Sequence, residues 1–333
     1  MSKWEPDVLG DGYEQLTIPL GSDPDGEGDV VATLVRYQPK SAAASAGRAV
    51  LYVHGFTDYF FHRHVAEHFA AQGYAFYALD LRKCGRSRRE GQTPHYVSEL
   101  ALYDTDLDSA VEIIRDETAG ELLVTAHSTG GLIVPLWLDR RRRTGRPVPG
   151  LSGVVLNSPW FDLQGPSYVR NVGTAAIEAA GRVRPMSTVP LGVSVAYGES
   201  LHAESNGEWN YDLNWKPLTG FPVTFGWLRA IRHGHAKLHR GLDIGAPSLI
   251  LRSQKTYFSS KYSSRVDGAD AVLDVDQIAR WAGCLGNRTT IVPIDGARHD
   301  VFLSAPAPRA AAFEELDLWL DWLHAQQGTS ASS

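Results

Sequence analysis

The sequence predicts an α/β fold in which a mostly parallel sheet is covered by helices on both faces. Short apolar runs alternate with amphipathic stretches over residues 49–156 and again over 248–326, and this alternation is typical of strands joined by helical crossovers. In the stretch Glu121 to Leu132, an apolar strand turns sharply through small residues into a helix. Ahead of this part, residues 13–18 and 30–37 are expected to form antiparallel edge strands, because a turn rich in Gly, Asp and Pro separates them.

The remaining elements follow from the spacing of the apolar residues. Short apolar runs bounded by turn residues indicate strands, and apolar residues three and four apart indicate helices. Pro135 lies inside the helix that follows the sharp turn, where it removes a hydrogen bond and is expected to cause a kink. The predicted strands are 49–53, 74–79, 122–125, 153–156, 248–251 and 289–294, and the predicted helices are 65–71, 100–115, 175–180, 224–238, 275–285 and 309–326.

The alternation of strands and helices stops between residues 161 and 245, a segment rich in Gly, Pro and aromatic residues. Because this segment follows a strand at the edge where α/β sheets bind ligands, we interpret it as a lid. The core would then be discontinuous, formed by residues 1–160 and 246–333. The alternative is a satellite subdomain whose aromatic side chains form a core of their own. Trp209 and Trp227 are the candidates in the lid for contact with a substrate.

Composition and charge exclude several classes of protein. The 333 residues are 43% hydrophobic and 21% charged, with a net charge of −6, which argues against a nucleic-acid-binding surface. Two cysteines, Cys84 and Cys284, are too few for a disulfide framework. The chain start lacks the apolar core of a signal peptide, and no stretch is apolar enough to cross a membrane. We expect a cytoplasmic protein with reduced thiols, for which transient contact with a lipid surface stays open and the oligomeric state is undetermined.

Ser128 lies in the sharp turn of the stretch ELLVTAHSTGGL. A strand, a turn with small residues on both sides of a serine, and a helix form the context of a nucleophile elbow, which holds the hydroxyl clear of the sheet edge. The flanking residues must be small because the serine adopts a strained backbone conformation. Ala126 stands where the usual G-x-S-x-G pattern has its first glycine. The alternative interpretation is a serine that caps an ordinary helix.

A serine hydroxyl is a weak nucleophile at neutral pH and needs a general base within hydrogen-bond reach. Among twelve histidines, His299 follows the last predicted strand, so it lies at the same edge of the sheet as the elbow. His127 is the neighbour of Ser128, but adjacent side chains diverge at a sharp turn. We therefore expect His299 to be the base and His127 to have a structural role.

A histidine base needs a carboxylate that fixes its tautomer and stabilises the cation formed in the reaction. Asp270 lies in the loop after the preceding strand, and one helix and one strand separate it from His299. That is the length of a single crossover, so both loops reach the same edge of the sheet. Asp267 is a close competitor, whereas Asp274 and Asp276 are better suited to capping the helix that begins there.

The reaction also needs backbone N–H groups directed at the oxyanion that develops in the transition state. Thr129 supplies one such group at the N-terminus of the helix after the elbow. Phe56, which follows His54-Gly55 at the end of the strand 49–53, is placed to supply the other. We expect His54 to brace this loop instead of acting as a second base.

Taken together, these segments resemble the α/β-hydrolases, in which the reacting residues occur in the order Ser, Asp, His. More narrowly, they resemble the monoacylglycerol lipase and lysophospholipase-like group, often labelled by its serine aminopeptidase-type domain. The resemblance covers residues 28–160 and 246–325 but not the predicted lid. It is carried by His54-Gly55-Phe56, the turn 80–87, the elbow around Ser128, the run 269–274 and Ala297-Arg298-His299.

The resemblance selects Asp270 over its neighbours, because in that group the aspartate opens a short D-x-V-hydrophobic-D run. Three departures from the family pattern stand out: Ala126 in the elbow, Arg298 in place of the glycine common before the histidine, and Lys83-Cys84 in the turn after Asp80. None of them removes a reacting group. They therefore bear on the substrate and on local geometry more than on the class of reaction.

The sequence thus predicts a serine carboxylic-ester hydrolase of the carboxylesterase, lipase or lysophospholipase type, without a cofactor. Ser128 would attack an acyl carbonyl, His299 would take its proton, and Asp270 would orient His299. The resemblance implies a single-chain acyl ester, such as a monoacylglycerol or a lysophospholipid, as the substrate.

Three alternatives stay open. The same triad could hydrolyse an amide or peptide, in which case carboxylates of the lid would bind the substrate amine. A non-catalytic ligand-binding protein on this fold is the second alternative, because fold does not dictate function. A metal enzyme is the least favoured, because His62 and His64 diverge on a helix and no third ligand stands out. The lid carboxylates are Glu199, Glu204, Glu208 and Asp212.

Overall fold

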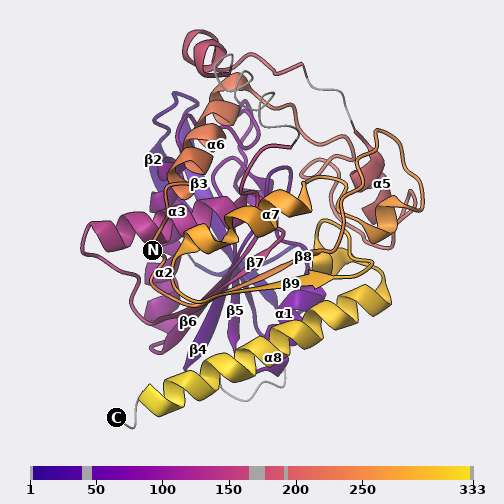
Figure 1. Cartoon of the computed structure of the whole chain (residues 1–333). Coiled ribbons are helices and arrows are strands. Elements are labelled where there is room, and N and C mark those ends of the chain that lie inside the picture. The colour runs from indigo at the N-terminus through magenta and orange to yellow at the C-terminus, as the bar shows by residue number, and fades with distance from the viewer. Residues whose placement is uncertain (1–2, 40–46, 165–176, 191–193, 331–333) are drawn as a thin grey trace.

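The computed structural model of the chain describes residues 3–39, 47–164, 177–190 and 194–330. Within these residues the strands form one sheet of order β1-β2-β3-β5-β4-β6-β7-β8-β9, with helices on both of its faces (Figure 1). The strands are β1 (Glu5–Pro6), β2 (Tyr13–Ser22), β3 (Asp29–Tyr37), β4 (Arg48–Val53), β5 (Ala75–Asp80), β6 (Glu121–His127), β7 (Leu151–Asn157), β8 (Ser248–Ser253) and β9 (Thr289–Ile294). The helices are α1 (Arg63–Ala71), α2 (Asp104–Glu117), α3 (Gly130–Arg143), α5 (Ala196–Leu201), α6 (Phe225–Leu238), α7 (Val275–Trp281) and α8 (Pro306–Ser330).

The strand directions confirm the predicted fold class. Strands β1 to β3 pair antiparallel, and β3 joins β5 in the same sense. From β5 to β9 every neighbouring pair is parallel. The carboxyl ends of these strands consequently meet at one edge of the sheet, and the loops after β4, β6, β8 and β9 all reach that edge.

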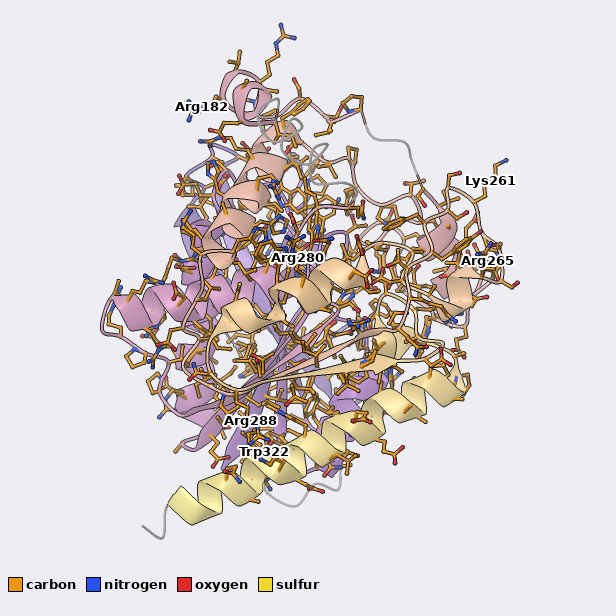
Figure 2. All side chains as sticks on the ribbon, viewed as in Figure 1. Arg182, Lys261, Arg265, Arg280, Arg288 and Trp322 are labelled. Carbon is orange, nitrogen blue, oxygen red and sulfur yellow. The ribbon has the colours of Figure 1, made fainter. Side chains whose placement is uncertain are left out.

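Each face of the sheet buries its own apolar cluster, because successive side chains of a strand point to opposite sides. In β4, for example, Leu51 belongs to the cluster under α2, α3 and α6, whereas Val50 and Tyr52 belong to the cluster under α1 and α8. On the α8 side, Arg288 before β9 lies 4.0 Å from the ring centre of Trp322 (Figure 2). Helices on both faces explain why the parallel strands consist of nearly continuous apolar runs.

Most predicted elements occur within two or three residues of their expected bounds. Two predicted helices are only partly α-helical. The helix expected at 100–115 begins as a 3₁₀ turn at Leu100–Tyr103, and the helix expected at 275–285 ends as a 3₁₀ turn at Ala282–Leu285. Helix α3 continues past Pro135 to Arg143. Of the helix expected at 175–180, residues 177–180 are helical, and the first two residues lie outside the described part.

The segment between β7 and β8, residues 158–247, shares the main core of the protein. Its helix α6 packs against α3, with Trp227 and Ile231 in the same apolar cluster as Leu132 and Leu136 of α3. A Cβ on Gly234 of α6 would lie 3.1 Å from Leu136 and 3.2 Å from Leu132 of α3, so the two helices approach closely at that point. The boundaries 161–245 of a separate lid stay a prediction.

Buried ion pairs hold the turn after β5 and explain one departure from the family pattern. The Lys83 side chain is fully buried, and its Nζ lies 2.5 Å from Asp23 and 2.7 Å from Glu27. Arg86 in the same turn is bound by Asp7 and Asp80. The ammonium of Lys83 therefore neutralises two carboxylates of the turn between β2 and β3, a stabilising role away from the reacting groups.

None of the helices in the described ranges is both long and apolar enough to cross a membrane.

A half-buried histidine joins helix α1 to the turn that follows His299. The Nε2 atom of His64 lies 2.9 Å from the carbonyl oxygen of Phe302, and its ring stacks on Trp209 at 4.6 Å. Burial lowers the pKa of His64 from 6.5 to about 4. The folded protein therefore holds this imidazole neutral at pH values where the unfolded chain has already protonated it.

We predict that the free energy of unfolding falls as the pH decreases from 6.5 toward 4, the window set by the two pKa values of His64. Above pH 6.5 the imidazole is neutral in both states, so the free energy of unfolding is unaffected. Below pH 6.5 the unfolded chain binds a proton that the folded protein does not, which lowers the free energy of unfolding by about 3 kcal/mol in total. Urea unfolding at a series of pH values measures the slope. His64→Gln keeps an N–H donor and should flatten it, whereas His233→Gln at an exposed position should not. Equal slopes in all three proteins would contradict the prediction.

Candidate active site

Ser128 lies in the turn between β6 and α3 with a backbone φ of 51°. This left-handed conformation is unfavourable for a residue with a side chain and matches the strained elbow expected from the sequence. A Cβ on Gly130 would lie 2.5 Å from the carbonyl oxygen of His54, and a Cβ on Gly55 would lie 2.9 Å from the Cβ of Ser128. The two loops approach this closely only because both positions are glycine. Ala126 is fully buried at the first elbow position.

The structure brings Ser128, Asp270 and His299 into one hydrogen-bonded line. The Nε2 atom of His299 lies 3.0 Å from the Ser128 hydroxyl oxygen, and its Nδ1 atom lies 2.8 Å from a carboxylate oxygen of Asp270. With Nδ1 protonated, His299 donates to Asp270 and accepts from Ser128. The exposed fractions of Ser128, His299 and Asp270 are 8%, 2% and 0%, so little water competes for these hydrogen bonds.

Local hydrogen bonds separate Asp270 from the competing aspartates. One carboxylate oxygen of Asp270 accepts from the backbone N–H groups of Val272 and Leu273, at 2.8 and 2.7 Å, which leaves the other for His299. Asp274 instead caps α7, as expected from its position in the sequence. Asp267 binds Arg298, whose guanidinium lies 2.9 Å away.

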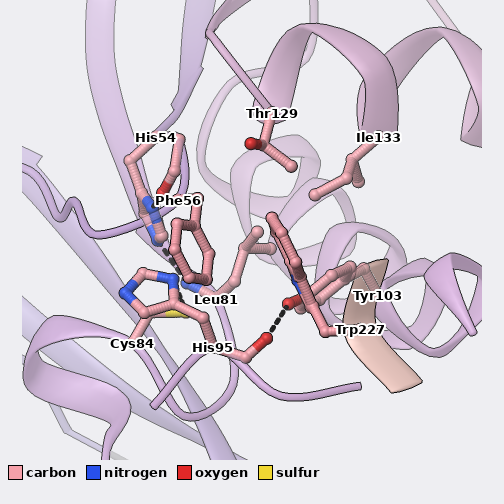
Figure 3. A pocket seen from close by; sticks show the side chains of 10 residues that line it. His54, Phe56, Leu81, Cys84, His95, Tyr103, Thr129, Ile133 and Trp227 are labelled. Atoms are coloured by element: carbon pink, nitrogen blue, oxygen red, sulfur yellow. Dashed lines mark hydrogen bonds between the residues drawn. The ribbon is translucent and has the colours of Figure 1, made fainter. Parts of the chain in front are cut away.

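Phe56 and Thr129, the predicted oxyanion donors, line one cavity, whose lining includes the residue after Ser128 but not Ser128 itself (Figure 3). They follow β4 and β6, which are adjacent parallel strands, so their loops lie next to each other. Within the described residues, neither backbone N–H donates to another backbone group.

The cavity beside Ser128 is narrow and mostly apolar. Its volume is about 10 Å³, roughly the space that one water molecule needs. The ring of Trp227 lies 4.1 Å from that of Phe56 and closes one side of the cavity. The structure does not bring Trp209 to this cavity, because its indole N–H donates to the carbonyl oxygen of Leu303 and its ring stacks on His64.

Three polar residues behind the cavity brace its wall. His54 accepts a hydrogen bond from the backbone N–H of Leu81 at 3.1 Å, which fits the expected bracing role (Figure 3). The Cys84 sulfur lies 3.2 Å from Nδ1 of His95. Burial raises the pKa of the Cys84 thiol well above its usual value and lowers the pKa of His95 well below its own. At neutral pH this pair is uncharged, so Cys84 is a poor nucleophile.

A second set of buried polar residues lies behind the triad, and the sequence reasoning missed most of it. Asp58 binds His127 at 3.2 Å, which places the His127 ring 4.9 Å from that of His299. Asp300 binds His62 at 3.0 Å and accepts a hydrogen bond from Asn157. The expected structural role of His127 agrees with these contacts. The position of these aspartates in the sequence could have identified them, because Asp58 and Asp300 follow the same strand ends as Phe56 and His299.

Both buried carboxylates are held in their charged form. Burial alone raises the pKa of Asp58, but the Lys216 ammonium and a hydrogen bond from His127 outweigh it and lower the pKa well below its usual value. Burial likewise opposes ionisation of Asp300, yet the nearby His127 and His62 lower its pKa. The site therefore contains two fixed negative charges besides Asp270, each matched by polar partners.

In the described part of the chain, no cluster of His, Cys, Asp and Glu side chains has the arrangement of a metal site. His62 and His64, considered above as ligands, bind Asp300 and the carbonyl of Phe302 instead.

Comparison with protein families identifies the family to which the chain belongs. The family model described as serine aminopeptidase, S33, matches residues 44–304. The chain belongs to this family. The match includes Ser128, Asp270 and His299 as well as the segment between β7 and β8. Membership of a family of hydrolases makes the chain a hydrolase.

Solved structures share the fold of this family member at low sequence identity. The chain is similar to a soluble variant of monoglyceride lipase from Saccharomyces cerevisiae in complex with a substrate analog, with a TM-score of 0.67, 17% identity and coverage of 97% of this chain and 99% of that one. It is also similar to the monoacylglycerol lipase of Paleococcus ferrophilus, with a TM-score of 0.61, 20% identity and coverage of 86% of this chain and 98% of that one. A third similar structure is a highly thermostable carboxyl esterase from Bacillus coagulans, with a TM-score of 0.64, 13% identity and coverage of 94% of this chain and 99% of that one. These likenesses confirm the α/β-hydrolase fold. No curated protein matches the chain.

We predict that Gly130→Ala disrupts the elbow. The added methyl group would meet the carbonyl oxygens of His54 and Val53 at 2.5 and 2.8 Å, so the elbow must move away from the loop that carries Phe56. Overpacking of this kind costs about 1 to 3 kcal/mol. Thermal unfolding and the rate of ester hydrolysis measure the two effects, and both should fall. Gly283→Ala, where nothing lies within 4 Å, is the matched control. A Gly130→Ala protein as active and stable as the control would refute this account.

Proposed function

We propose that this hydrolase cleaves carboxylic esters through a Ser-His-Asp triad and an acyl-enzyme intermediate. The observation that carries the proposal is the hydrogen-bonded line from Asp270 through His299 to Ser128. A hydroxyl that donates to a histidine, which in turn donates to a carboxylate, is the arrangement that turns serine into a nucleophile.

The first half of the reaction forms the acyl-enzyme. The Ser128 oxygen attacks the ester carbonyl carbon while its proton passes to Nε2 of His299. The resulting imidazolium is stabilised by Asp270, which remains ionised. When the tetrahedral intermediate collapses, His299 donates the same proton to the alcohol that leaves. In the second half, water attacks the acyl carbonyl while His299 takes its proton. When this second intermediate collapses, His299 returns the proton to the Ser128 oxygen and the carboxylic acid leaves.

The N–H groups of Phe56 and Thr129 are proposed to bind the negatively charged oxygen of both tetrahedral intermediates. Loss of one such donor typically lowers the rate by a factor of roughly 10² to 10³. Their loops follow adjacent strands, and the glycines at positions 55 and 130 permit the close approach of the two loops. The proposal thus gives the small residues around the elbow a catalytic consequence.

The proposed substrates are single-chain acyl esters, such as a monoacylglycerol or a lysophospholipid. Support comes from the sequence resemblance and from the apolar lining of the cavity, which includes Phe56, Leu81, Ile133 and Trp227. Two structural neighbours are named as monoglyceride or monoacylglycerol lipases. Because the cavity holds about one water molecule, an acyl chain enters only if Trp227 moves. We therefore propose that residues 161–245, which include Trp227, act as a lid.

Amide or peptide hydrolysis by the same triad is the second candidate, and the name of the family favours it. It requires a carboxylate near Ser128 that binds a substrate amine. Glu204, Glu208 and Asp212 are exposed, and Glu208 lies 3.5 Å from Arg309 on α8. The ion pair with Arg309 argues against Glu208 as the residue that binds a substrate amine, so the ester stays the first candidate.

The proposal predicts that Ser128→Ala abolishes hydrolysis of p-nitrophenyl esters from acetate to palmitate, because it removes the nucleophile. His299→Ala should lower kcat by a factor of roughly 10⁴ or more, and Asp270→Asn by slightly less. Circular dichroism checks that each variant is folded. Folded wild-type protein that hydrolyses none of the esters would refute the ester proposal, and amino-acid p-nitroanilides would then test the amide candidate.

Trp227→Ala is predicted to shift the preference toward longer acyl chains, because removal of the indole opens the cavity. The ratio of kcat/KM for octanoate over butyrate should rise about 10-fold. Trp209→Ala is the control, since its ring packs on His64 away from the cavity, and it should leave this ratio unchanged. Both variants lose stability, as Trp→Ala substitutions do, so the ratio is compared at a temperature where both are folded. An unchanged ratio in Trp227→Ala would exclude the proposed acyl site.

A further inference from the structure

The segment between β7 and β8 places a buried lysine next to the loop that carries Phe56. Lys216 lies between α5 and α6 and is 6% exposed. Its Nζ donates to a carboxylate oxygen of Asp58 at 2.9 Å and to the carbonyl oxygen of Thr57 at 3.4 Å. Three aromatic rings, those of Phe61, Tyr197 and Tyr211, surround the ammonium at 5.8 to 5.9 Å. A buried ammonium is retained only where such partners compensate for the loss of water.

Thr57 is the residue through which Lys216 reaches the oxyanion loop. Its φ of 52° lies in the left-handed region, which a β-branched residue rarely adopts. A strained backbone persists only where its surroundings hold it. Here the Thr57 hydroxyl accepts a hydrogen bond from the backbone N–H of Phe221 at 2.9 Å, and the Thr57 carbonyl accepts one from Lys216. Both partners belong to the segment between β7 and β8.

The same cluster also touches the loop of His299. The ring of Tyr197, one of the three around Lys216, packs edge to face on His299 with ring centres 5.5 Å apart. Its hydroxyl oxygen accepts a hydrogen bond from the backbone N–H of Asp300 at 3.3 Å. Asp58, the carboxylate partner of Lys216, also binds His127 next to Ser128. One docking point of the segment therefore contacts the loops after β4 and β9, and it reaches His127 at the end of β6 through Asp58.

We propose that Lys216 is a positioning residue that docks the segment between β7 and β8 onto the oxyanion loop and thereby holds the Phe56 N–H in its working position. This inference rests on the proposed function, because it assigns Lys216 to hydrolysis at Ser128. Lys216 does not touch the reacting atoms. It acts through Thr57, whose strained conformation shapes the turn directly after Phe56 and so holds in place the short loop that carries the Phe56 N–H. When the stretch from Tyr197 to Phe221 separates from this loop, Thr57 relaxes and the oxyanion site is lost, so only the docked form is active.

The test compares four variants of the cluster and one control variant with the wild type. Lys216→Met removes the ammonium but keeps a side chain of similar length, and Lys216→Arg keeps the positive charge. Asp58→Asn and the double variant Lys216→Met/Asp58→Asn complete a cycle. Lys261→Met, at an exposed lysine that extends away from the molecule (Figure 2), is the control. The readouts are Tm, kcat and KM for p-nitrophenyl butyrate, and the rate of phosphonylation by a fluorophosphonate. In that last step Ser128 attacks phosphorus, fluoride leaves, and His299 takes the hydroxyl proton.

Lys216→Met is expected to lower kcat and the phosphonylation rate about 10-fold to 100-fold, with KM changed less than about threefold. Lys216→Arg should recover part of the loss. The double variant has no unpaired buried charge, so its Tm should return toward the wild-type value while its rates stay low. Asp58→Asn keeps the contact between Lys216 and Thr57 and should retain more activity than Lys216→Met.

Three outcomes would overturn the inference. Wild-type rates in Lys216→Met with a lowered Tm mean that Lys216 only stabilises the fold. Recovery of the rates together with Tm in the double variant means that Lys216 only neutralises Asp58. A loss in Asp58→Asn equal to that of the double variant assigns the role to Asp58. The phosphonylation rate decides these cases even if no ester is hydrolysed, so failure of the ester proposal is recognised separately.

Discussion

The left-handed backbone of Ser128 is the constraint on which the rest of the site depends. A residue with a side chain adopts this conformation only where the surrounding structure forces it. Here the forcing groups are the carboxyl end of β6, the start of α3 and the loop after β4, which approach so closely that positions 55 and 130 admit no Cβ. The hydroxyl is thereby directed to His299, 3.0 Å away. A parallel sheet supplies this arrangement because the ends of its strands meet at one edge.

Charge balance is the second condition for this site. Three buried carboxylates, those of Asp58, Asp270 and Asp300, lie around the elbow, and isolated charges in such surroundings would destabilise the fold strongly. Each is matched by histidine, amide, lysine or backbone N–H partners. Since Asp58 takes its cation from the segment between β7 and β8, the electrostatics of the catalytic edge depend on a part of the chain outside the regular α/β alternation.

That segment has two physical parts with different relations to the core. Helix α6 belongs to the main apolar cluster through Trp227 and Ile231. The stretch around Tyr197 and Lys216 instead docks through polar contacts and aromatic rings onto the loops that carry Phe56 and His299. A mostly polar docking surface separates at lower cost than an apolar core. Within the proposed lid, we therefore expect the second part to move more readily than α6, from which only the Trp227 side chain has to turn away to open the cavity.

The sequence by itself determined the fold class, because the alternation of strands and helices dictates a parallel sheet. It singled out Ser128 and His299 from their positions at the strand ends, and the resemblance to the family selected Asp270 over Asp267. These three lie together because topology alone brings strand ends to one edge; their catalytic roles stay proposals. Only the tertiary structure decided which of the aromatic residues lines the cavity, since Trp227 and Trp209 occur in similar surroundings along the chain. It alone placed Lys216 beside Asp58, 158 positions away. Such contacts depend on how loops without periodic patterns pack, and no local pattern in the sequence encodes that.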